Sequence, residues 1–494
     1  MNQNNIVQGA ENTQHYELVV VGAGIAGLNA LYAAVQYLPP EARVLLVDQK
    51  SLAGGMWNVA YHYARLHQPH PMFTVGDMKW SWRRPAAYLA SRDDVQAHLA
   101  SAITPVKNKV RLSTRFQHTV TSCAEVESSG GSLVRITCHQ NDSPSRCHTI
   151  TADRAVYAPG LNYKVADSLP FSSENVASVV PQELEDALEM HPDAHVYVVG
   201  GGKSGMDTIL ASLAANRARK VTLIRGRGTN FFNRTKYIPN GLARWTSGTP
   251  LSRVFHDMAM HFDGENEDSL IAYFRTRYST DQASSNEVFL YGIQSEEERN
   301  QIASGLAESI PGYLADVKDS QNGPVMEFRD GTSRSVEKDS IFVNCTGGFF
   351  RDAQMSKKLS FLSTNNSMLS IGTREAIHFL TGVSGFFATH LLYRNQIRGR
   401  GFYMLDHEAL FRLNRNAWVG ASVAQAYLNQ TIAVQTLPMM LLDRCGLDLD
   451  RWYPLPRRLH ALYKMKANTN RDIDHCKRVL DRIGERFDIH CAPL

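Results

Sequence analysis

Two glycine-rich segments of the same form, one in each half of the 494-residue chain, constrain the fold most strongly. The first segment is Gly22-Ala23-Gly24-Ile25-Ala26-Gly27, and the second is Gly200-Gly201-Gly202-Lys203-Ser204-Gly205. Each segment follows a short apolar run of strand character, 18–21 or 196–199, and each opens a helix-forming stretch. Strand, glycine turn and helix in this order are typical of a doubly wound α/β unit. The sequence therefore predicts an α/β fold with two Rossmann-like domains.

Both segments have the spacing of a dinucleotide-binding fingerprint. The first glycine makes the tight turn, the second lets the backbone approach a pyrophosphate, and the third lets the helix pack close to the strand. The helix N-terminus offers N–H groups and a positive dipole end to the phosphates. Two fingerprints imply two dinucleotides, for which the usual pair is FAD and a nicotinamide. The predicted contacts are Gly22, Gly24, Ile25, Ala26 and Gly27 at the first fingerprint, and Gly200, Gly202, Lys203, Ser204 and Gly205 at the second.

The residue that ends the next strand distinguishes the two sites. Asp48 follows the strand 44–47, where a carboxylate can accept hydrogen bonds from ribose hydroxyls and would repel a 2′-phosphate. The first site therefore suits FAD or NAD, although Asp48 can also be a simple strand cap. The strand 221–224 ends instead in Arg225 and Arg227, whose guanidinium groups can hold a 2′-phosphate. The second site therefore suits NADP(H), with solvated surface charges as the alternative for both arginines.

Further cofactor contacts are predicted outside the fingerprints. The loop Gly54-Gly55-Met56-Trp57 combines glycines, which let a backbone approach a ligand, with the flat apolar wall of a tryptophan. Gly55, Met56 and Trp57 are the predicted contacts of this loop. The remaining predicted contacts are Gln49, Val120, Thr346 and Gly347.

Chain length and two similar glycine-containing segments at strand ends predict the order of the domains. A chain of 494 residues is too long for one core. Ala158-Pro159-Gly160 and Cys345-Thr346-Gly347 each follow a strand, and we interpret them as the points where the chain leaves and re-enters the first domain. We expect an FAD-binding domain in two parts, 1–164 and 341–400, around an NADP-binding domain with an insertion, 165–340. A helical C-terminal extension, 401–494, follows.

Composition narrows the class of protein. A net charge of +4, from 52 basic and 48 acidic residues, is too balanced to favour a nucleic-acid partner. The seven scattered cysteines form no Cys-x-x-Cys pair, which favours free thiols in a reducing compartment and argues against a disulfide reductase. Histidines and cysteines lack the spacing of a zinc site, so we expect no metal.

The N-terminal and apolar segments predict a cytoplasmic protein without a membrane span. Residues 1–15 have no apolar h-region of a secretory signal. The longest apolar stretch, 18–38, contains the first fingerprint together with Asn29 and Gln36, which suits strand, turn and helix better than a membrane span.

The order of these motifs resembles that of the flavin-containing monooxygenases, which belong to the class B flavoprotein monooxygenases. The resemblance covers about residues 16–395. It rests on both fingerprints, Asp48, the loop 54–57, Arg65-Leu66-His67-Gln68-Pro69, Ser204-Gly205-x-Asp207, Arg225 and Cys345-Thr346-Gly347. The family signature Phe-x-Gly-x-x-x-His is altered, because its best counterpart, 171–177, has Ser173 for the glycine and Ala177 for the histidine. The resemblance is therefore to a divergent member.

The resemblance implies an NADPH-dependent FAD monooxygenase. NADPH would reduce FAD, O₂ would add to the reduced flavin, and a flavin C4a-hydroperoxide would pass one oxygen atom to a small organic substrate, with nitrogen or sulfur as the preferred target. His67, Gln68 and Asn58 are the predicted catalytic residues beside the flavin, with a structural hydrogen-bonded role as the alternative for His67. An FAD-dependent NAD(P)H oxidase or reductase, a Baeyer–Villiger monooxygenase and a non-catalytic nucleotide-binding protein stay open, as does the oligomeric state.

Overall fold

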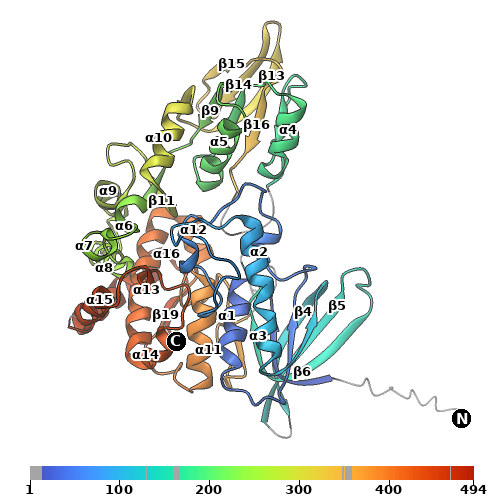
Figure 1. The fold of residues 1–494 in the computed structure, drawn as a ribbon, viewed down its shortest axis with the longest axis vertical. Coiled ribbons are helices and arrows are strands. Elements are labelled where there is room, and N and C mark those ends of the chain that lie inside the picture. Colours follow the sequence, from blue (N-terminus) through green and yellow to red (C-terminus); the bar gives the residue numbers. More distant parts are fainter. Residues whose placement is uncertain (1–13, 129–130, 161–165, 348–349, 351–358, 468) are drawn as a thin grey trace, which may run out of the picture.

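Two parallel sheets, one behind each fingerprint, organise the structure (Figure 1). The computed structural model describes residues 14–128, 131–160, 166–347, 350, 359–467 and 469–494. In Figure 1 the first sheet lies at the lower right, the second at the top, and a group of helices at the lower left. The predicted fold class, α/β with two Rossmann-like domains and a helical C-terminal extension, is confirmed.

The first sheet joins a parallel half to an antiparallel meander. Its strands run in the order β3-β2-β1-β6-β5-β4, with β1 Gln14–Val21, β2 Arg43–Val47, β3 Arg111–Arg115, β4 His118–Ser128, β5 Gly131–Gln140 and β6 Cys147–Tyr157. β1 pairs in parallel with β2 and β6, and β17 (Met368–Ser370) pairs in parallel with β6. Leu18 and Val20 pack into one core and Val19 and Val21 into another, because successive side chains of a strand point to opposite faces.

Helices cover one face of the first sheet and hold its fingerprint. The elements are α1 (Ile25–Ala34), α2 (Arg92–Ser101), α3 (Ile103–Lys107) and α11 (Thr381–Tyr393). α11 crosses α1 so closely that a Cβ on Gly385 would lie 2.3 Å from the backbone oxygen of Ala26. Only glycine fits at this crossing, so the α11 sequence is matched to the first fingerprint across more than 350 residues of chain.

The second sheet is parallel throughout. Its strands run in the order β12-β9-β8-β16-β7, with β7 Ala177–Val179, β8 Val196–Val199, β9 Val221–Ile224, β12 Glu308–Ile310 and β16 Ile341–Asn344. The helices of this part are α4 (Leu184–Met190), α5 (Lys203–Ala215) and α10 (Glu296–Gly305). An antiparallel sheet of β13 (Leu314–Ser320), β14 (Gly323–Phe328) and β15 (Ser333–Ser335) packs Val317 and Met326 against Tyr197 and Phe342.

The prediction that the chain returns to the first domain at residue 341 is wrong. β16 pairs in parallel with β8 and β7, so it belongs to the second sheet, and among the described residues the chain rejoins the first sheet at β17. β16 stands beside β8 as β6 stands beside β1, and each strand ends in a glycine-containing exit. The shared pattern therefore marks the strand beside a fingerprint and not a change of domain. The predicted boundary at 164 and 165 lies outside the described residues.

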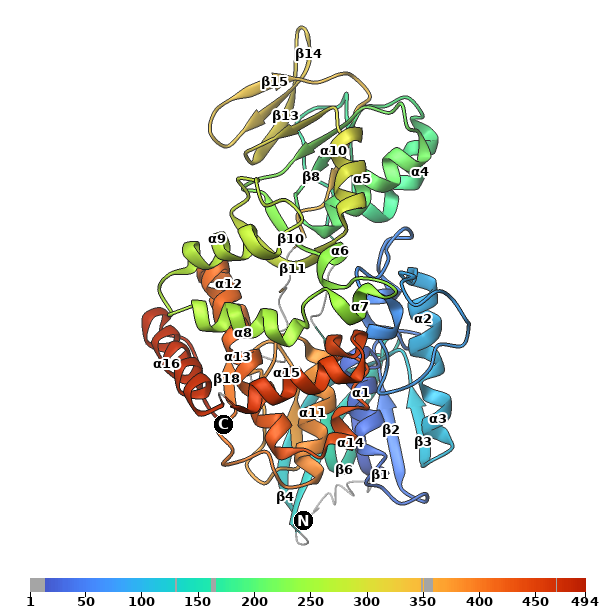
Figure 2. The ribbon, with the colours of Figure 1, turned by 60° about the vertical axis from the view of Figure 1, so that its left-hand side comes forward.

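The third region combines a segment between the two sheets with the C-terminal part of the chain (Figure 2). The first segment contains β10 (Thr229–Asn233), α6 (Arg234–Tyr237), α7 (Ala243–Thr246), α8 (Leu251–His261), α9 (Glu267–Tyr278) and β11 (Val288–Gln294). The C-terminal part contains β18 (Tyr403–Leu405), α12 (His407–Leu413), α13 (Arg415–Thr436), α14 (Met439–Leu442), α15 (Leu455–Ala467), α16 (Thr469–Phe487) and β19 (Cys491–Pro493).

The buried helix α13 joins these two parts of the third region. It packs against α8 and α9 of the first segment and against α12 and α16 of the C-terminal part. Its N-cap Asn414 accepts hydrogen bonds from the N–H groups of Asn416 and Ala417, which fixes where the helix begins. None of the described helices is both long and apolar enough to cross a membrane.

Candidate functional site

The first fingerprint forms the turn from β1 into α1, and its three glycines stand in different surroundings. Gly22 has φ +102°, and a Cβ there would lie 2.0 Å from the backbone oxygen of Ala158. A Cβ on Gly27 would lie 1.8 Å from the oxygen of Gly22. A Cβ on Gly24, by contrast, would approach Gly55 Cα no closer than 3.4 Å, which is ordinary van der Waals contact. The fold therefore requires glycine at 22 and 27, whereas at 24 it would tolerate a Cβ in contact with Gly55.

Asp48 connects the end of β2 to the fingerprint. Its Oδ2 accepts a hydrogen bond of 2.5 Å from the Ala23 N–H, and its Oδ1 accepts one of 2.6 Å from the Lys50 N–H. Burial raises the pKa of this carboxyl group, and the two backbone donors oppose that shift. Each oxygen of a carboxylate can accept more than one hydrogen bond. Asp48 thus caps the turn and keeps lone pairs for a further donor, so the strand-cap role does not exclude the predicted bond to a ribose hydroxyl.

The loop after Gly54 lies directly on the fingerprint. The Gly54 N–H donates to the oxygen of Ala23, and a Cβ on Gly55, at φ +58°, would lie 2.9 Å from Gly24 Cα. This loop is the short helical turn Gly55–Asn58, in which Met56 exposes 52% of its surface and Trp57 stands edge-on to Phe73. The predicted Gly55 therefore lies against Gly24, and Met56 and Trp57 follow it in the same short helical turn.

Three other predicted residues of the first half have local roles. Asn58 donates from Nδ2 to the oxygen of Leu52 and accepts from Gln96 Nε2 at 3.3 Å, so its side chain closes its own loop. Gln49 is exposed, and its backbone oxygen accepts a hydrogen bond from Asn141. Val120 is buried in the core on the β-meander face of the first sheet.

The second fingerprint repeats the glycine pattern of the first. A Cβ on Gly200, at φ +118°, would lie 2.8 Å from the oxygen of Cys345, and one on Gly205 would lie 2.1 Å from the oxygen of Gly200. A Cβ on Gly202 would meet no described atom within 4 Å. Thr346 donates from both its N–H and its hydroxyl to Asn344 Oδ1, which holds the exit containing Thr346 and Gly347 beside this turn. The second site again has two glycines required by the fold and a middle one that is open.

Lys203 and Ser204 begin the helix α5. The Lys203 ammonium group forms an ion pair with Asp207 one turn later, and the hydroxyl group of Tyr61 donates to the same carboxylate at 2.8 Å. Burial raises the pKa of Asp207, whereas Lys203 and Tyr61 lower it. Tyr61 was not predicted from the sequence, because its partner lies 146 residues away.

Arg225 and Arg227 stand at the end of β9, as predicted, together with an acidic neighbour that the sequence did not indicate. Arg225 donates to Asn286 Oδ1 at 3.3 Å, and Arg227 lies 4.0 Å from the carboxylate of Glu287. Parallel pairing of β10 with β11 brings residues 286 and 287 to this position. Both Arg227 and Glu287 remain largely exposed, so the guanidinium group is accessible to a second anion.

His67 belongs to the segment that follows the loop 54–58, and it contacts Arg234 of α6 and Ile293 of β11. Its backbone oxygen accepts from Arg234 at 2.9 Å, and its Nδ1 accepts from the N–H of Ile293 at 3.4 Å, so Nε2 carries the proton of the neutral ring. Burial, assisted by Lys203 and Arg234, lowers the pKa of His67 to about 3. His67 is therefore a neutral hydrogen-bond donor at physiological pH.

The neighbouring Gln68 has an acceptor without a partner. Its Oε1 is buried and accepts no hydrogen bond from any described residue. A buried polar atom of this kind needs a donor from water or a ligand. In the same segment, the Tyr63 hydroxyl contacts Thr208 at 3.0 Å, so residues 61–63 pack against α5.

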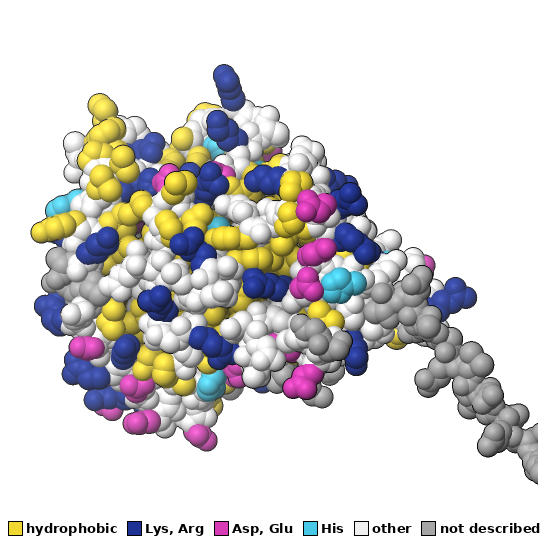
Figure 3. Space-filling view, turned by 90° about the horizontal axis from the view of Figure 1, so that it is seen from below, with side chains coloured by type: hydrophobic (Ala, Val, Ile, Leu, Met, Phe, Trp, Pro, Cys, Tyr) yellow, Lys and Arg dark blue, Asp and Glu magenta, His cyan; other side chains and the backbone are white. Residues whose placement is uncertain are grey.

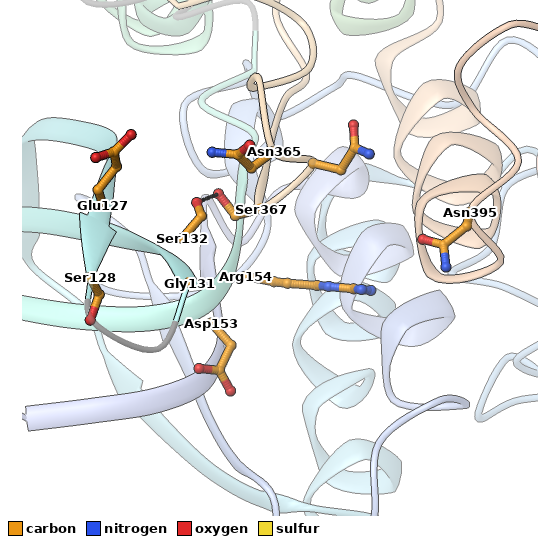
Figure 4. Close-up of a pocket in the computed structure, with 10 residues that line it drawn as sticks. Glu127, Ser128, Gly131, Ser132, Asp153, Arg154, Asn365, Ser367 and Asn395 are labelled. Atoms are coloured by element: carbon orange, nitrogen blue, oxygen red, sulfur yellow. Dashed lines mark hydrogen bonds between the residues drawn. The ribbon is translucent and has the colours of Figure 1, made fainter.

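Two cavities lie away from the fingerprints. A polar cavity of about 600 Å³ opens beside β5 and β6 and is lined by Glu127, Asp153, Arg154, Asn365 and Asn395, among others (Figure 4). A second cavity, of about 1010 Å³, lies between Pro69, Arg234, Ile238 and the start of α10. None of their lining residues belongs to either fingerprint. The described residues contain no cluster of three or more potential metal ligands.

Comparison with known proteins agrees with this geometry. Residues 16–235 match the family model described as pyridine nucleotide-disulphide oxidoreductase. The FAD-containing monooxygenase EthA of Mycobacterium tuberculosis is 25% identical over 242 residues, and the match covers 48% of this chain and 47% of EthA. The EthA protein of Mycolicibacterium smegmatis is 21% identical over 247 residues, with 48% of each chain covered. Over about half of its length, this chain is similar in sequence to FAD-containing monooxygenases.

The matched regions leave half of each relative outside the comparison. The chain spans about half the length of the curated relatives it matches. Among solved structures, the polycyclic ketone monooxygenase of Thermothelomyces thermophila has the same fold, with a TM-score of 0.50, 12% identity and coverage of 94% of this chain and 90% of that one. All seven cysteines lie in the described residues, and none of them forms a disulfide.

Proposed function

We propose that this chain is an NADPH-dependent FAD monooxygenase that oxygenates a small organic substrate, with nitrogen or sulfur as the preferred target. The observation that carries the proposal is the repeated glycine pattern. In both fingerprints the outer glycines are required by protein backbone, whereas a Cβ on Gly24 would make only van der Waals contact with Gly55 and a Cβ on Gly202 would meet no described atom within 4 Å. A side chain missing where no protein atom excludes it is best explained by a ligand backbone or pyrophosphate that must come close.

The surroundings of the two turns support different cofactors. FAD is proposed at the first turn, where Asp48 keeps lone pairs for a ribose hydroxyl and Met56 and Trp57 provide an apolar wall. NADP(H) is proposed at the second turn, where Arg225 and Arg227 offer guanidinium groups to a 2′-phosphate. Thr346 and Gly347 are assigned to the second site, because their exit lies against Gly200.

Bound FAD would supply the chemistry that no side chain can provide, which is hydride acceptance and activation of O₂. The chain would position the cofactors and keep water away. His67 would donate a hydrogen bond from Nε2–H without changing its charge, and Gln68 would accept one at its unpaired Oε1. Asn58 is proposed to hold the loop 55–58 in place, since both ends of its side chain are already bonded there.

The domain organisation is proposed as an insertion. An FAD domain would contain β1 to β6 and return at β17, and the parallel sheet with β16 would form the NADP domain between these parts. A cytoplasmic location stays a prediction, as does the oligomeric state.

A second candidate function is an NAD(P)H oxidase without oxygen insertion. The observation that favours it is the altered family signature at 171–177, where Ser173 donates to Asp319 and Ala177 begins β7. A Baeyer–Villiger reaction is a third candidate, since the polycyclic ketone monooxygenase shares the fold.

The first experiment tests cofactor identity and use together. The purified protein is expected to be yellow, and anaerobic NADPH should bleach the flavin absorbance faster than an equal concentration of NADH. Readmission of air should restore the absorbance and release less hydrogen peroxide than the NADPH consumed once a substrate is present. Stoichiometric peroxide with every soft nucleophile tried would favour the oxidase, and a colourless protein that binds no added FAD would contradict the proposal.

A further inference from the structure

Large apolar side chains are exposed together on one face of the helical region. Leu455, Leu459 and Tyr463 of α15 expose 59%, 50% and 70% of their surfaces. Beside them, Trp245 of α7 and Met440 of α14 expose 59% and 72%. We call the surface formed by these five side chains the α15 face. Apolar residues gathered on one surface of a monomer indicate an interaction site.

Two arginines hold α15 against its neighbouring elements α7 and α14. Arg457 donates to the backbone oxygens of Arg244 at 3.1 Å and Gly248 at 2.8 Å, which ties one flank of α15 to the α7 segment. Arg458 donates to Asp443 at 2.8 Å, which ties the other flank to the end of α14. α15 therefore lies between α7 and α14, and its remaining face points outward, at the edge of the molecule in Figure 1.

The sequence of α15 has the pattern of an amphipathic helix turned outward. Leu455, Leu459 and Tyr463 are four residues apart, so they form one row along the helix. The segment LPRRLHALYKMKA contains four Lys or Arg residues and one histidine, but no acidic residue. Lys464 and His460 are exposed next to the apolar row. A row of this kind normally faces a core, whereas here it faces solvent.

We propose that the α15 face docks onto the headgroup region of a bilayer that contains anionic lipid. Its composition fits that partner, because exposed leucine, methionine, tryptophan and tyrosine insert at the headgroup boundary while basic residues attract anionic headgroups. The space-filling view of Figure 3 shows apolar, basic and acidic side chains interspersed on the lower side of the molecule. The proposal is independent of the proposed catalytic function.

A second copy of the chain fits this face less well. A two-fold dimer through the α15 face would bring the same patch against itself, so the cationic residues of two α15 helices would face each other. Such like-charge contacts oppose association. The described residues of α15 offer no carboxylate to relieve the repulsion.

Co-sedimentation with vesicles tests the proposal on the full-length protein. Phosphatidylcholine vesicles are compared with vesicles of phosphatidylcholine and phosphatidylglycerol in equal parts. We expect binding to the anionic vesicles and much weaker binding to the neutral ones. Binding should fall when salt shortens the screening length to roughly 3 Å at 1 M.

Substitutions within the α15 face test whether this surface is the one that binds the vesicles. The double substitution Leu459→Ser and Tyr463→Ser should abolish sedimentation, and Lys464→Gln should weaken it by about fivefold. The matched control is Met190→Ser, which removes an equally exposed apolar residue from α4 in the second half of the molecule and should change nothing. Circular dichroism of each variant verifies that the fold is intact.

Two results would overturn the proposal. One is the absence of sedimentation, or equal sedimentation with both vesicle types. The other is a dimer of the wild-type protein that the Leu459 and Tyr463 substitutions dissociate, which would assign the α15 face to a second copy.

Discussion

At the residue scale, the two kinds of glycine in a fingerprint make separable demands on the chain. Gly27 is fixed by the fold, since a Cβ would lie 1.8 Å from the oxygen of Gly22, whereas a Cβ on Gly24 would find ordinary contact at 3.4 Å. The sequence predicts both positions from the same motif. Only the structure shows that a Cβ is excluded by backbone at Gly27 and tolerated at Gly24.

This difference predicts the outcome of two substitutions. Gly24→Val should lower FAD affinity by tenfold or more, which corresponds to about 1.4 kcal/mol, with little change in thermal stability. Gly27→Val should lower stability as well, because backbone would have to move. Flavin content per folded protein and the melting temperature are the two measurements. Full flavin content in Gly24→Val would contradict the assignment of FAD to the first turn.

The second residue-scale prediction concerns the preference for NADPH. Arg225→Ala should weaken NADPH binding by about 1.5–3 kcal/mol, roughly ten- to a hundredfold, and leave NADH nearly unchanged, because only NADPH has the 2′-phosphate. The matched variant is Glu287→Gln. It should increase the affinity for NADPH, since the Glu287 carboxylate that it removes lies 4.0 Å from Arg227. Dissociation constants for both nicotinamides give the answer. An equal loss for the two coenzymes would show that Arg225 does not bind the 2′-phosphate.

At the element scale, local sequence patterns predict where strands and helices lie, but they do not predict which strands pair or which distant residues come into contact. β1, α1, β8 and α5 follow from apolar runs and glycine turns in the sequence. The pattern at 341–347 predicts a return to the first domain, whereas β16 belongs to the second sheet, because the strand beside each fingerprint ends in the same way. Tyr61 and Glu287 reach their sites through contacts between distant segments, which no local pattern indicates.

The crossing of α1 and α11 gives an element-scale prediction. Gly385→Ala should destabilise the protein by about 1–3 kcal/mol, because the new Cβ would meet the backbone of Ala26 at 2.3 Å. Gly305→Ala is the control, since its Cβ would meet only the end of the flexible Leu213 side chain. Denaturant titration of both variants measures the difference. Equal stability of the two variants would mean that the helices separate without cost.

At the scale of the whole molecule, buried neutral histidines make the fold sensitive to acid. His378 and His407 are buried, and burial lowers the pKa of each from 6.5 to about 3. The unfolded chain therefore binds protons below pH 6.5 that the folded chain does not bind, so stability is lost as the pH falls from 6.5 toward 3.

The expected loss at pH 5 is about 2 kcal/mol for each of these two histidines. Thermal or denaturant unfolding at pH 7.5 and pH 5 measures it, with ionic strength held constant. A protein that is equally stable or more stable at pH 5 would contradict the burial of neutral histidines.

The central claim is that electrons from NADPH are used to insert oxygen into a substrate. The most direct measurement is the fate of isotopically labelled O₂ during NADPH oxidation with a panel of amines, thioethers, hydroxylamines and ketones. We expect one labelled oxygen atom in an organic product, at nitrogen or sulfur, for each NADPH consumed in coupled turnover. Recovery of all the label as hydrogen peroxide with every compound would contradict the claim and identify an oxidase.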